Sequence, residues 1–420
     1  MAFFCGVIKL VDDNKNRLLR PLGRRQFFAS LGRSLLAIVA TLKGGLVASS
    51  ELKKSKNIGQ ELDFMLPGKL GNPDMNMIDD PRLDRRIRDA YIANPVLPEA
   101  PPVELSIYPT YEDSLAMVQW MDDMLKGKSA QQEASMPYFP DITSSRETIE
   151  GTTGHKISLY VDKPKKYSGP IPCLLHFHGG GMSFSSATAP LSIRWRKTLA
   201  QQGLLVIGVE FANQTLHEGN QPFPAGLNDC ASAVRWAHSN RNTLGISSVV
   251  LTGESGGGNL VIATAIKANK EGWVNEIDGV FALAPMIIGI YGPELPPNLP
   301  SWRENYGYMG NRPLVRMMTK VYDPNDEHEK NPLAWPFHAQ DSDLRGLPPH
   351  IILNYELDLI RDDGVVFAQK LRAAGVDATA MIINGADHVP EIAMPDTIPE
   401  LTRSTLASIA AFSRGVQPQN

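Results

Sequence analysis

The chain has 420 residues, of which 43% are hydrophobic and 20% charged, and its formal net charge is −4. These values are ordinary for a soluble globular protein and argue against a dominant nucleic-acid-binding surface. The 3 cysteines cannot build a disulfide framework, no Cys/His cluster has zinc spacing, and no apolar run reaches transmembrane length. We expect Cys173 and Cys230 to be small core residues, and we expect neither a metal nor a stable membrane span.

Residues 1–50 form a basic segment, because no acidic residue stands between Asp13 and Glu51. Within it, Arg24 and Arg25 precede a polar and then a large apolar residue, which resembles the twin-arginine export motif. Basic residues bracket a short hydrophobic stretch, however, and no clear cleavage site follows. Two readings stay open: a cytoplasmic protein with a basic amphipathic N-terminal helix, and export through a twin-arginine signal.

Residues 51–150 combine helix-like pieces with proline-rich breaks. The stretch Asp80–Tyr91 begins like a helix, with Asp80 as N-cap, Pro81 in the first turn and arginines on a solvated face. A second predicted helix, Ser114–Leu125, is rich in Met and Trp. Its methionines fit core packing, or alternatively a lid that faces a substrate.

From about residue 155 the pattern becomes regular, with strand-like runs separated by helix-like runs. Continuous apolar strands that alternate with amphipathic helices predict a mainly parallel sheet covered on both faces. Residues 286–346 interrupt this alternation with prolines, aromatics and glycines, as functional lids and binding loops do. The predicted strands are Lys156–Val161, Pro172–Phe177, Leu204–Phe211, Ser248–Thr252, Gly279–Leu283, His350–Tyr355 and Ala378–Ile383, and the clearest helices are Ala225–Ser239, Asp363–Ala374 and Leu401–Arg414.

The junction at residues 250–260 carries the strongest chemical signal. Its run Gly253-Glu254-Ser255-Gly256-Gly257 matches G-x-S-x-G and stands between a strand-like and a helix-like run. In that context a sharp turn lifts the serine hydroxyl clear of the sheet, and the flanking glycines avoid a Cβ clash. The helix that begins there also points N–H groups at any negative charge that forms. We interpret Ser255 as a nucleophile; the alternative is a glycine-rich turn with a capping serine.

A second glycine-rich run, His178-Gly179-Gly180-Gly181, directly follows the strand-like run Pro172–Phe177. An enzyme that transfers acyl groups must stabilise the oxyanion of its tetrahedral intermediate, and backbone N–H groups do so where the chain approaches the substrate closely. We predict that the N–H groups of Gly180, Gly181 and Gly256 are these donors. His178 is interpreted as an anchor of the loop and not as a base. The alternative is a flexible glycine-rich turn.

A serine nucleophile needs a histidine base and an acid that orients it, and in this arrangement both follow the serine, acid first, on loops after later strands. Asp358 follows the sixth predicted strand and His388 follows the last. Of the 9 histidines, only His388 lies in a loop after the last predicted strand. We predict Asp358 and His388 on this ground. Asp358 could instead cap a helix, and Glu356, Asp362 and Asp363 are the competing acids.

Together these motifs resemble the hormone-sensitive-lipase-like family of serine carboxylesterases, within the α/β-hydrolase superfamily. The resemblance covers roughly residues 155–415. The run Glu356–Gly364 is similar to the family's D-P-L-R-D-E-G, whose first aspartate is catalytic, which supports Asp358. The other matching stretches are His178–Gly181, Gly253–Gly257, Asp229–Trp236 and Leu347–Pro349.

The sequence departs from the family pattern at three positions. Leu359 replaces the usual proline, and Gly256 stands where many members have alanine. His388 is followed by Val389-Pro390 rather than the frequent G-F, which could alter the pocket beside the base.

The resemblance implies an α/β-hydrolase fold, with a mainly parallel central sheet flanked by helices and a helical cap. Residues 51–150 would form an N-terminal helical cap region. Residues 151–420 would form the catalytic domain, with a cap insertion at about 286–346. A homodimer is a further possibility.

The expected activity is hydrolysis of carboxylic esters of short to medium acyl chain, through an acyl-enzyme on Ser255 and without a cofactor. Glu254 either stabilises the serine turn or shapes the acyl pocket. One alternative is an amidase or peptidase with the same triad. The other is a non-catalytic binding protein, because plant gibberellin receptors resemble the family but lack its catalytic histidine, whereas His388 is present here.

Overall fold

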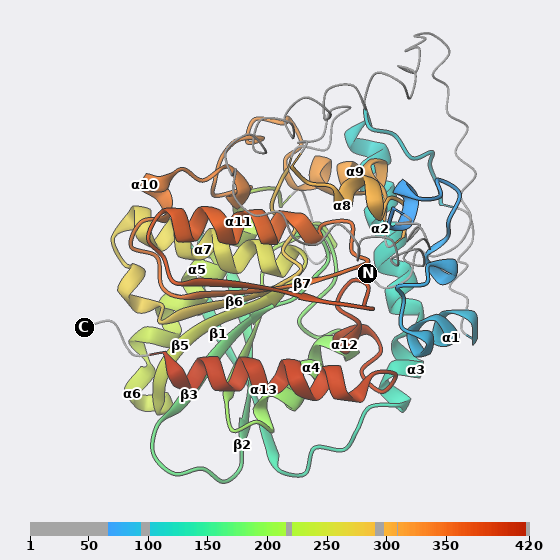
Figure 1. The fold of residues 1–420 in the computed structure, drawn as a ribbon. Helices are drawn as coiled ribbons and strands as arrows, with labels where there is room; N and C mark the ends of the chain where they lie inside the picture. The colour runs from blue at the N-terminus through green and yellow to red at the C-terminus, as the bar shows by residue number, and fades with distance from the viewer. Residues whose placement is uncertain (1–65, 94–100, 216–220, 290–297, 309, 417–420) are drawn as a thin grey trace, which may run out of the picture. The chain divides into compact units, whose positions relative to one another are not determined.

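The architecture is an eight-stranded sheet with helices on both faces (Figure 1). The computed structural model describes residues 66–93, 101–215, 221–289, 298–308 and 310–416. Within them the strand order is β1-β2-β4-β3-β5-β6-β7-β8. Strand β2 pairs antiparallel with β1 and β4, and all later pairings are parallel. The strands are β1 (Ile142–Glu150), β2 (Lys156–Pro164), β3 (Ile171–Phe177), β4 (Leu205–Glu210), β5 (Ile246–Glu254), β6 (Gly279–Leu283), β7 (His350–Tyr355) and β8 (Ala378–Ile383).

Helices α5, α7 and α11 cover one face of the sheet, and α4 and α13 cover the other (Figure 1). This two-sided cover is what parallel strands require, because the helical crossovers between them lie against the sheet faces. The helices are α1 (Arg85–Ala93), α2 (Tyr111–Gly127), α3 (Ser129–Ala134), α4 (Pro190–Ala200), α5 (Ala225–Ser239), α6 (Arg241–Leu244), α7 (Gly256–Glu271), α8 (Ser301–Glu304), α9 (Arg312–Tyr322), α10 (Asp341–Leu344), α11 (Arg361–Ala373), α12 (Pro390–Ala393) and α13 (Pro399–Gly415).

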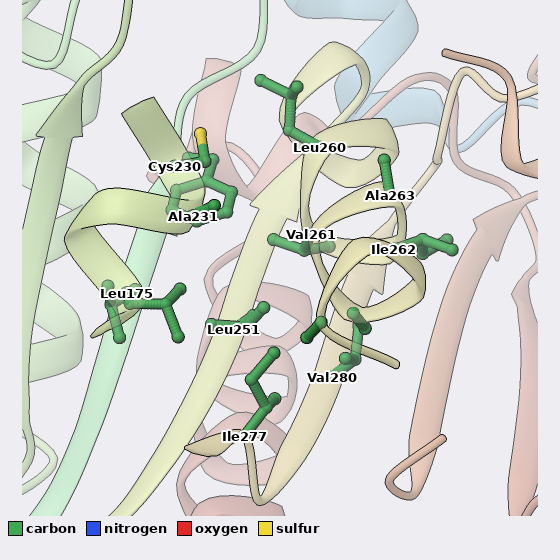
Figure 2. Close-up of a cluster of buried hydrophobic side chains, with 14 of the residues drawn as sticks. Leu175, Cys230, Ala231, Leu251, Leu260, Val261, Ile262, Ala263, Ile277 and Val280 are labelled. Carbon is green, nitrogen blue, oxygen red and sulfur yellow. The ribbon is translucent and has the colours of Figure 1, made fainter. Parts of the chain in front are cut away.

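The central strands are apolar on both faces because helices bury both of them. Every residue of β3 and of β6 is buried. Figure 2 shows one part of this core, where side chains of β3, β5 and β6 meet those of α5 and α7. Cys173 and Cys230 are fully buried there and not disulfide-bonded, as predicted, and burial raises the pKa of both thiols. Cys5 lies outside the described residues.

The seven predicted strands are confirmed, but the sheet also contains β1, which the sequence pattern did not indicate. Strand β1 pairs with β2 along its whole length, from Ile142 opposite Pro164 to Glu150 opposite Lys156. Only Ile142 in β1 is buried, and its remaining residues are mostly polar and exposed. Without an apolar face the period-two signal is missing. The sheet therefore begins before residue 151, where we had placed the start of the catalytic domain.

The region before the sheet departs from prediction at Asp80. Helix α1 begins only at Arg85, and Asp80 follows a short 3-10 helix, η2 (Met77–Asp79). Asp80 is 2% exposed, and its carboxylate accepts hydrogen bonds from Arg82 and from the Tyr308 hydroxyl. The predicted capping role of Asp80 and the solvated position of Arg82 are thus wrong. Tyr308 lies far along the chain, so a local capping pattern could not indicate this partner.

Helix α2 uses its methionines mainly for packing. Met117, Val118 and Met121 are buried, and α2 packs against α9 of the insertion at residues 286–346. No helix within the described ranges is long and apolar enough to cross a membrane. The twin-arginine motif at Arg24 and Arg25 lies outside the described residues.

Candidate active site

Ser255 occupies the turn between β5 and α7, in a backbone conformation that L-residues rarely adopt. Its φ is 56° and its ψ is −116°. Its N–H donates to the Leu283 carbonyl at 2.9 Å, and its own carbonyl accepts from the Met286 N–H at 3.1 Å. A Cβ on Gly257 would stand 1.9 Å from the Phe177 carbonyl oxygen, and one on Gly253 would stand 2.6 Å from it. The turn therefore requires glycine at both positions 253 and 257.

The loop Gly179–Gly181 lies directly against this turn. Gly180 and Gly181 have φ values of 113° and 58°, both in the region that favours glycine. A Cβ on Gly256 would stand 2.7 Å from the Gly181 nitrogen and 2.5 Å from the Met182 nitrogen. The Gly256 N–H opens α7, so it has no partner within its helix. The three predicted donors thus gather beside Ser255.

Asp358 and His388 come together from the ends of neighbouring strands β7 and β8. The Nδ1 of His388 is 2.7 Å from the Asp358 Oδ2, and both side chains are buried. The other Asp358 oxygen accepts the Ile360 N–H at 3.1 Å. Among the described residues, the His388 Nε2 has no hydrogen-bond partner. With Nδ1 engaged by Asp358, Nε2 is the ring nitrogen left to exchange a proton.

The three competing acids hold loops rather than His388. The Glu356 carboxylate accepts the Gly385 N–H at 2.8 Å. Asp362 accepts the Ser301 N–H at 2.7 Å, and Asp363 accepts the Trp302 indole N–H at 2.8 Å. Each of these bonds ties a neighbour of Asp358 to another part of the chain.

His178 and Glu254 shape the glycine loop. The His178 Nδ1–H donates to the Gly179 carbonyl at 2.7 Å, and its ring stacks on Phe211 with centroids 4.2 Å apart. Burial lowers the pKa of His178, which keeps the imidazole neutral. These contacts agree with an anchoring position for this ring.

The Glu254 carboxylate connects the glycine loop to His176 of β3. Its Oε1 accepts the Gly179 N–H at 2.7 Å, and its Oε2 is 2.9 Å from the His176 Nε2. Burial opposes ionisation of Glu254, but His176 and the Gly179 N–H outweigh it and lower the pKa of this carboxyl. The Glu254 carboxylate therefore holds the glycine loop, and it also borders the larger of the pockets at Ser255.

Two pockets meet at Ser255 and His388. The larger has a volume of about 250 Å³ and is bordered by α2, α3, the glycine loop, the start of α4 and α12. The smaller has a volume of about 30 Å³ and is almost wholly apolar, with Met286, Val315 and Met318 in its wall. The described residues contain no group of three or more His, Cys, Asp or Glu side chains that could hold a metal ion.

Several residues around the site escaped sequence reasoning. Asp387 and Glu391 are fully buried beside His388, where Tyr91 donates to Asp387 and Tyr355 donates to Glu391 at 2.6 Å. Burial raises the pKa of Asp387 to about 6 and that of Glu391 to about 7. The position of Asp387 directly before His388 was the only signal in the sequence, since the tyrosine partners lie far away along the chain.

Comparison with known proteins places the chain in a family. A family model described as alpha/beta hydrolase fold matches residues 174–391, just over half of the chain. Brefeldin A esterase, described as a bacterial homologue of human hormone sensitive lipase, is 36% identical, with a TM-score of 0.77 over 83% of this chain and 98% of its own. The chain therefore belongs to the alpha/beta hydrolase fold family.

Relatives with named activities indicate the class of enzyme within this family. An arylesterase of Saccharolobus solfataricus is 30% identical over 58% of this chain and 78% of its own length. A carboxylesterase of Mycobacterium tuberculosis is 27% identical over 56% and 72%, respectively. With brefeldin A esterase, these relatives identify a hormone-sensitive-lipase-like hydrolase of the carboxylesterase type. The family, fold and enzyme class predicted from the sequence are thereby confirmed.

Proposed function

We propose that this esterase hydrolyses carboxylic esters through a catalytic triad of Ser255, His388 and Asp358. One observation carries the proposal: the Asp358–His388 pair, 2.7 Å apart, borders with Ser255 a pocket beside the glycine-loop amides. The buried carboxylate holds the imidazole in the tautomer that leaves Nε2 as the base.

The reaction proceeds in two halves. The Ser255 Oγ attacks the acyl carbon while His388 Nε2 takes its proton, and the carbonyl becomes a tetrahedral oxyanion. When the ester C–O bond breaks, His388 returns that proton to the leaving alcohol, and the acyl group stays on Ser255. Water then attacks the acyl-enzyme, gives a proton to His388 and releases the acid, after which Ser255 regains its proton.

The oxyanion is stabilised by the N–H groups of Gly180, Gly181 and Gly256. Each donor is fixed before the reaction, because Glu254 holds the loop at Gly179 and the Gly256 backbone belongs to α7. Preformed donors need no reorganisation as charge develops, and one of them contributes roughly 3–4 kcal/mol to the transition state.

The unequal pockets support a substrate with one short and one larger part. A space of about 30 Å³ beside Ser255 accepts an acyl group of short to medium length only if its methionines shift, whereas the pocket of about 250 Å³ takes a bulkier group directly. Helices α2 and α3 border the larger pocket, which supports a cap built from residues before the sheet.

An ester is favoured over an amide because an alkoxide leaves more readily than an amine. An amidase or peptidase would use the same triad, and paired ester and amide substrates with one acyl group separate the two. The presence of His388 beside Asp358 argues against a protein that only binds its ligand.

The test is a panel of p-nitrophenyl esters from acetate to palmitate, assayed with the wild type, Ser255→Ala and Ser404→Ala. Ser404 is an exposed serine on α13 and serves as the matched control. We expect Ser255→Ala to lower kcat by roughly 10⁴-fold or more and Ser404→Ala to leave it unchanged. Activity that survives in Ser255→Ala would falsify the proposed nucleophile, and activity that rises towards palmitate would contradict the acyl range.

A further inference from the structure

The segment of residues 77–93, here called the N-terminal brace, is connected to both loops that carry the acid and the base. It comprises η2, the turn at Asp80–Asp84 and helix α1. It contacts the loop after β8, which contains His388, directly, and it reaches the loop after β7, which contains Asp358, through Glu304 and Asn305. The two connections use different residues of the brace.

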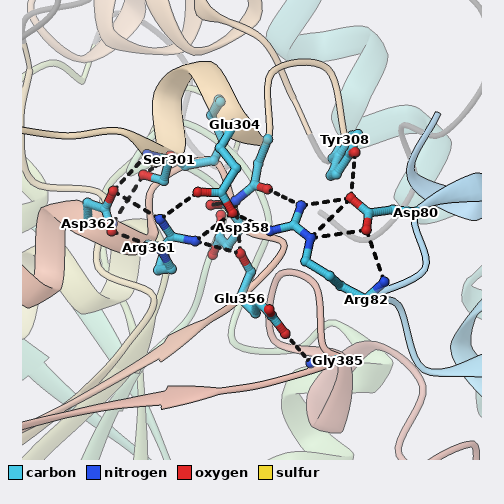
Figure 3. Close-up of polar contacts among 12 residues, drawn as sticks. Asp80, Arg82, Ser301, Glu304, Tyr308, Glu356, Asp358, Arg361, Asp362 and Gly385 are labelled. Carbon is cyan, nitrogen blue, oxygen red and sulfur yellow. Dashed lines mark hydrogen bonds and ion pairs between the residues drawn. The ribbon is translucent and has the colours of Figure 1, made fainter. Parts of the chain in front are cut away.

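The first connection runs through Arg82. Its guanidinium binds the Asp80 carboxylate at 2.7 Å and forms an ion pair with Glu304 of α8 (Figure 3). Glu304 is 6% exposed and also receives Arg361, whose two terminal nitrogens lie 3.0 and 3.1 Å from its two oxygens. Burial opposes the charge of Arg361, but Asp362 and Glu304 raise its pKa further. Glu304 is therefore shared by two arginines, one before the sheet and one at the start of α11.

The same cluster reaches the backbone of the acid itself. Asn305 is fully buried, and its side-chain amide donates to the Asp358 carbonyl at 2.8 Å and to the Glu356 carbonyl at 2.9 Å. The Asn305 side-chain oxygen accepts from Arg82 at 3.1 Å. Arg361 adds a bond to the Glu356 carbonyl at 3.1 Å. The backbone at Glu356 and Asp358 is thus held by the side chain of Asn305, which itself bonds to Arg82.

The second connection runs to the base. The Asp84 N–H donates to the Gly385 carbonyl at 2.8 Å. The Tyr91 hydroxyl donates to Asp387, a buried carboxyl directly before His388 in the chain. Gly385 is held from its other side by Glu356, so the acid loop and the base loop are also tied to each other.

We propose that the N-terminal brace positions the catalytic acid and base: Arg82 acts on Asp358 through Glu304 and Asn305, which lie outside the brace, and Tyr91 acts on His388 through Asp387. These are positioning residues, because none of them touches Ser255 or borders either pocket. The proposal rests on the proposed triad. A misplaced imidazole or carboxylate lowers the rate of the chemical step steeply, since catalysis depends on distances fixed to within a fraction of an ångström.

The experiment compares Glu304→Gln and Tyr91→Phe, two nearly isosteric variants, with Arg85→Met as the matched control. Arg85 lies on the same segment, but its side chain is 76% exposed, and its one ion pair with a described residue is with Asp89 at 3.8 Å. We expect each of the first two variants to lower kcat about tenfold with KM within about twofold, and Arg85→Met to change neither. Melting temperatures measured alongside show that the variants are folded at the assay temperature.

Double variants show whether the brace residues act through Asp358 and His388 or independently of them. Asp358→Asn alone is expected to lower kcat by about 10⁴-fold, because the imidazole then takes the wrong tautomer. If the brace acts through the acid and base, adding Glu304→Gln or Tyr91→Phe to Asp358→Asn lowers kcat by less than about twofold more. If the double variant loses the product of the two single-variant factors in kcat, the proposal is overturned. It is also overturned if Glu304→Gln and Tyr91→Phe lower the melting temperature but not kcat. Ser255→Ala tests the proposed function separately, since its outcome does not depend on the brace.

Discussion

The nucleophile side and the acid–base side of this active site are held by different means. Ser255 and the glycine loop depend on backbone contacts between β5, α7 and the end of β3, where an added Cβ would meet backbone atoms at 1.9–2.7 Å. Asp358 and His388 stand in loops that backbone hydrogen bonds tie to each other and that are also held by side chains from elsewhere, including Asn305 and Tyr91. The nucleophile is therefore specified locally, whereas the acid and base are specified by distant parts of the chain.

Two buried glutamates, one on each side of the site, differ in the direction of their pKa shifts. Glu254, on the nucleophile side, receives a backbone N–H and lies beside His176, so its pKa is lowered despite burial. Glu391, on the acid–base side, receives the hydroxyls of Tyr355 and Thr405 and a backbone hydrogen bond, but burial outweighs them and raises its pKa to about 7. His176, together with the Gly179 N–H, outweighs the effect of burial on Glu254, whereas the hydrogen bonds of Glu391 do not offset its loss of water.

Outside the triad, the largest effect is expected where the backbone of the serine turn meets that of the glycine loop. A Cβ on Gly256 would lie 2.5 Å from the Met182 nitrogen and 2.7 Å from the Gly181 nitrogen. Gly256→Ala must therefore displace the glycine loop, and we expect kcat to fall about 100-fold, comparable to the loss of an oxyanion donor. A fully active Gly256→Ala enzyme would show that the loop adapts and that the local constraint is weak.

A smaller effect is expected for the anion that fixes this loop. Glu254→Gln replaces charge-assisted bonds by neutral ones, and we expect the free energy of unfolding at pH 7 to fall by about 2 kcal/mol. Because the folded-state pKa of Glu254 is lowered, its stabilisation is present above the carboxyl's ordinary pKa and is lost as the pH falls. Denaturant titrations of both proteins should therefore converge towards acidic pH; a constant difference would contradict an ionised Glu254.

The smallest effect, with the opposite pH dependence, is expected at Glu391. Its folded-state pKa is raised, so the favourable contribution of the neutral acid is complete below its ordinary pKa and is lost as the pH rises towards about 7. Glu391→Gln keeps the side chain neutral at every pH. The melting temperature of this variant relative to wild type should accordingly rise by a few degrees between about pH 4.5 and 7. A flat difference across that range would show that Glu391 is ionised.

The sequence indicated the local parts of the structure well. The five central strands, β3 to β7, carry their own signal because both of their faces are buried, and the glycines around Ser255 are required by the turn itself. Loop positions after β7 and β8 selected Asp358 and His388, which the structure brings within 2.7 Å of each other. In each case the information lies within a few residues of the feature.

Long-range polar contacts could not be predicted in this way. Arg82 looked like one of several helix-surface arginines, yet it is largely buried between Asp80 and Glu304, whereas Arg85 nearby is exposed. Nothing in their immediate neighbourhood distinguishes the two, because burial is decided by α8, more than two hundred residues later. Strand β1 was missed for a related reason, since its pairing with β2 involves exposed, polar side chains.

The contact between Tyr91 and Asp387 also bears on how the enzyme is made. A ribosome releases the chain from the N-terminus, and 296 positions separate these two residues. At about 5–20 residues per second, Tyr91 emerges roughly 15–60 s before its partner exists. The nucleophile turn and its sheet neighbours can form during that interval, but the acid and base loops cannot be clamped until synthesis has passed residue 387. The proposed triad can therefore be completed only after residue 388 has been synthesised.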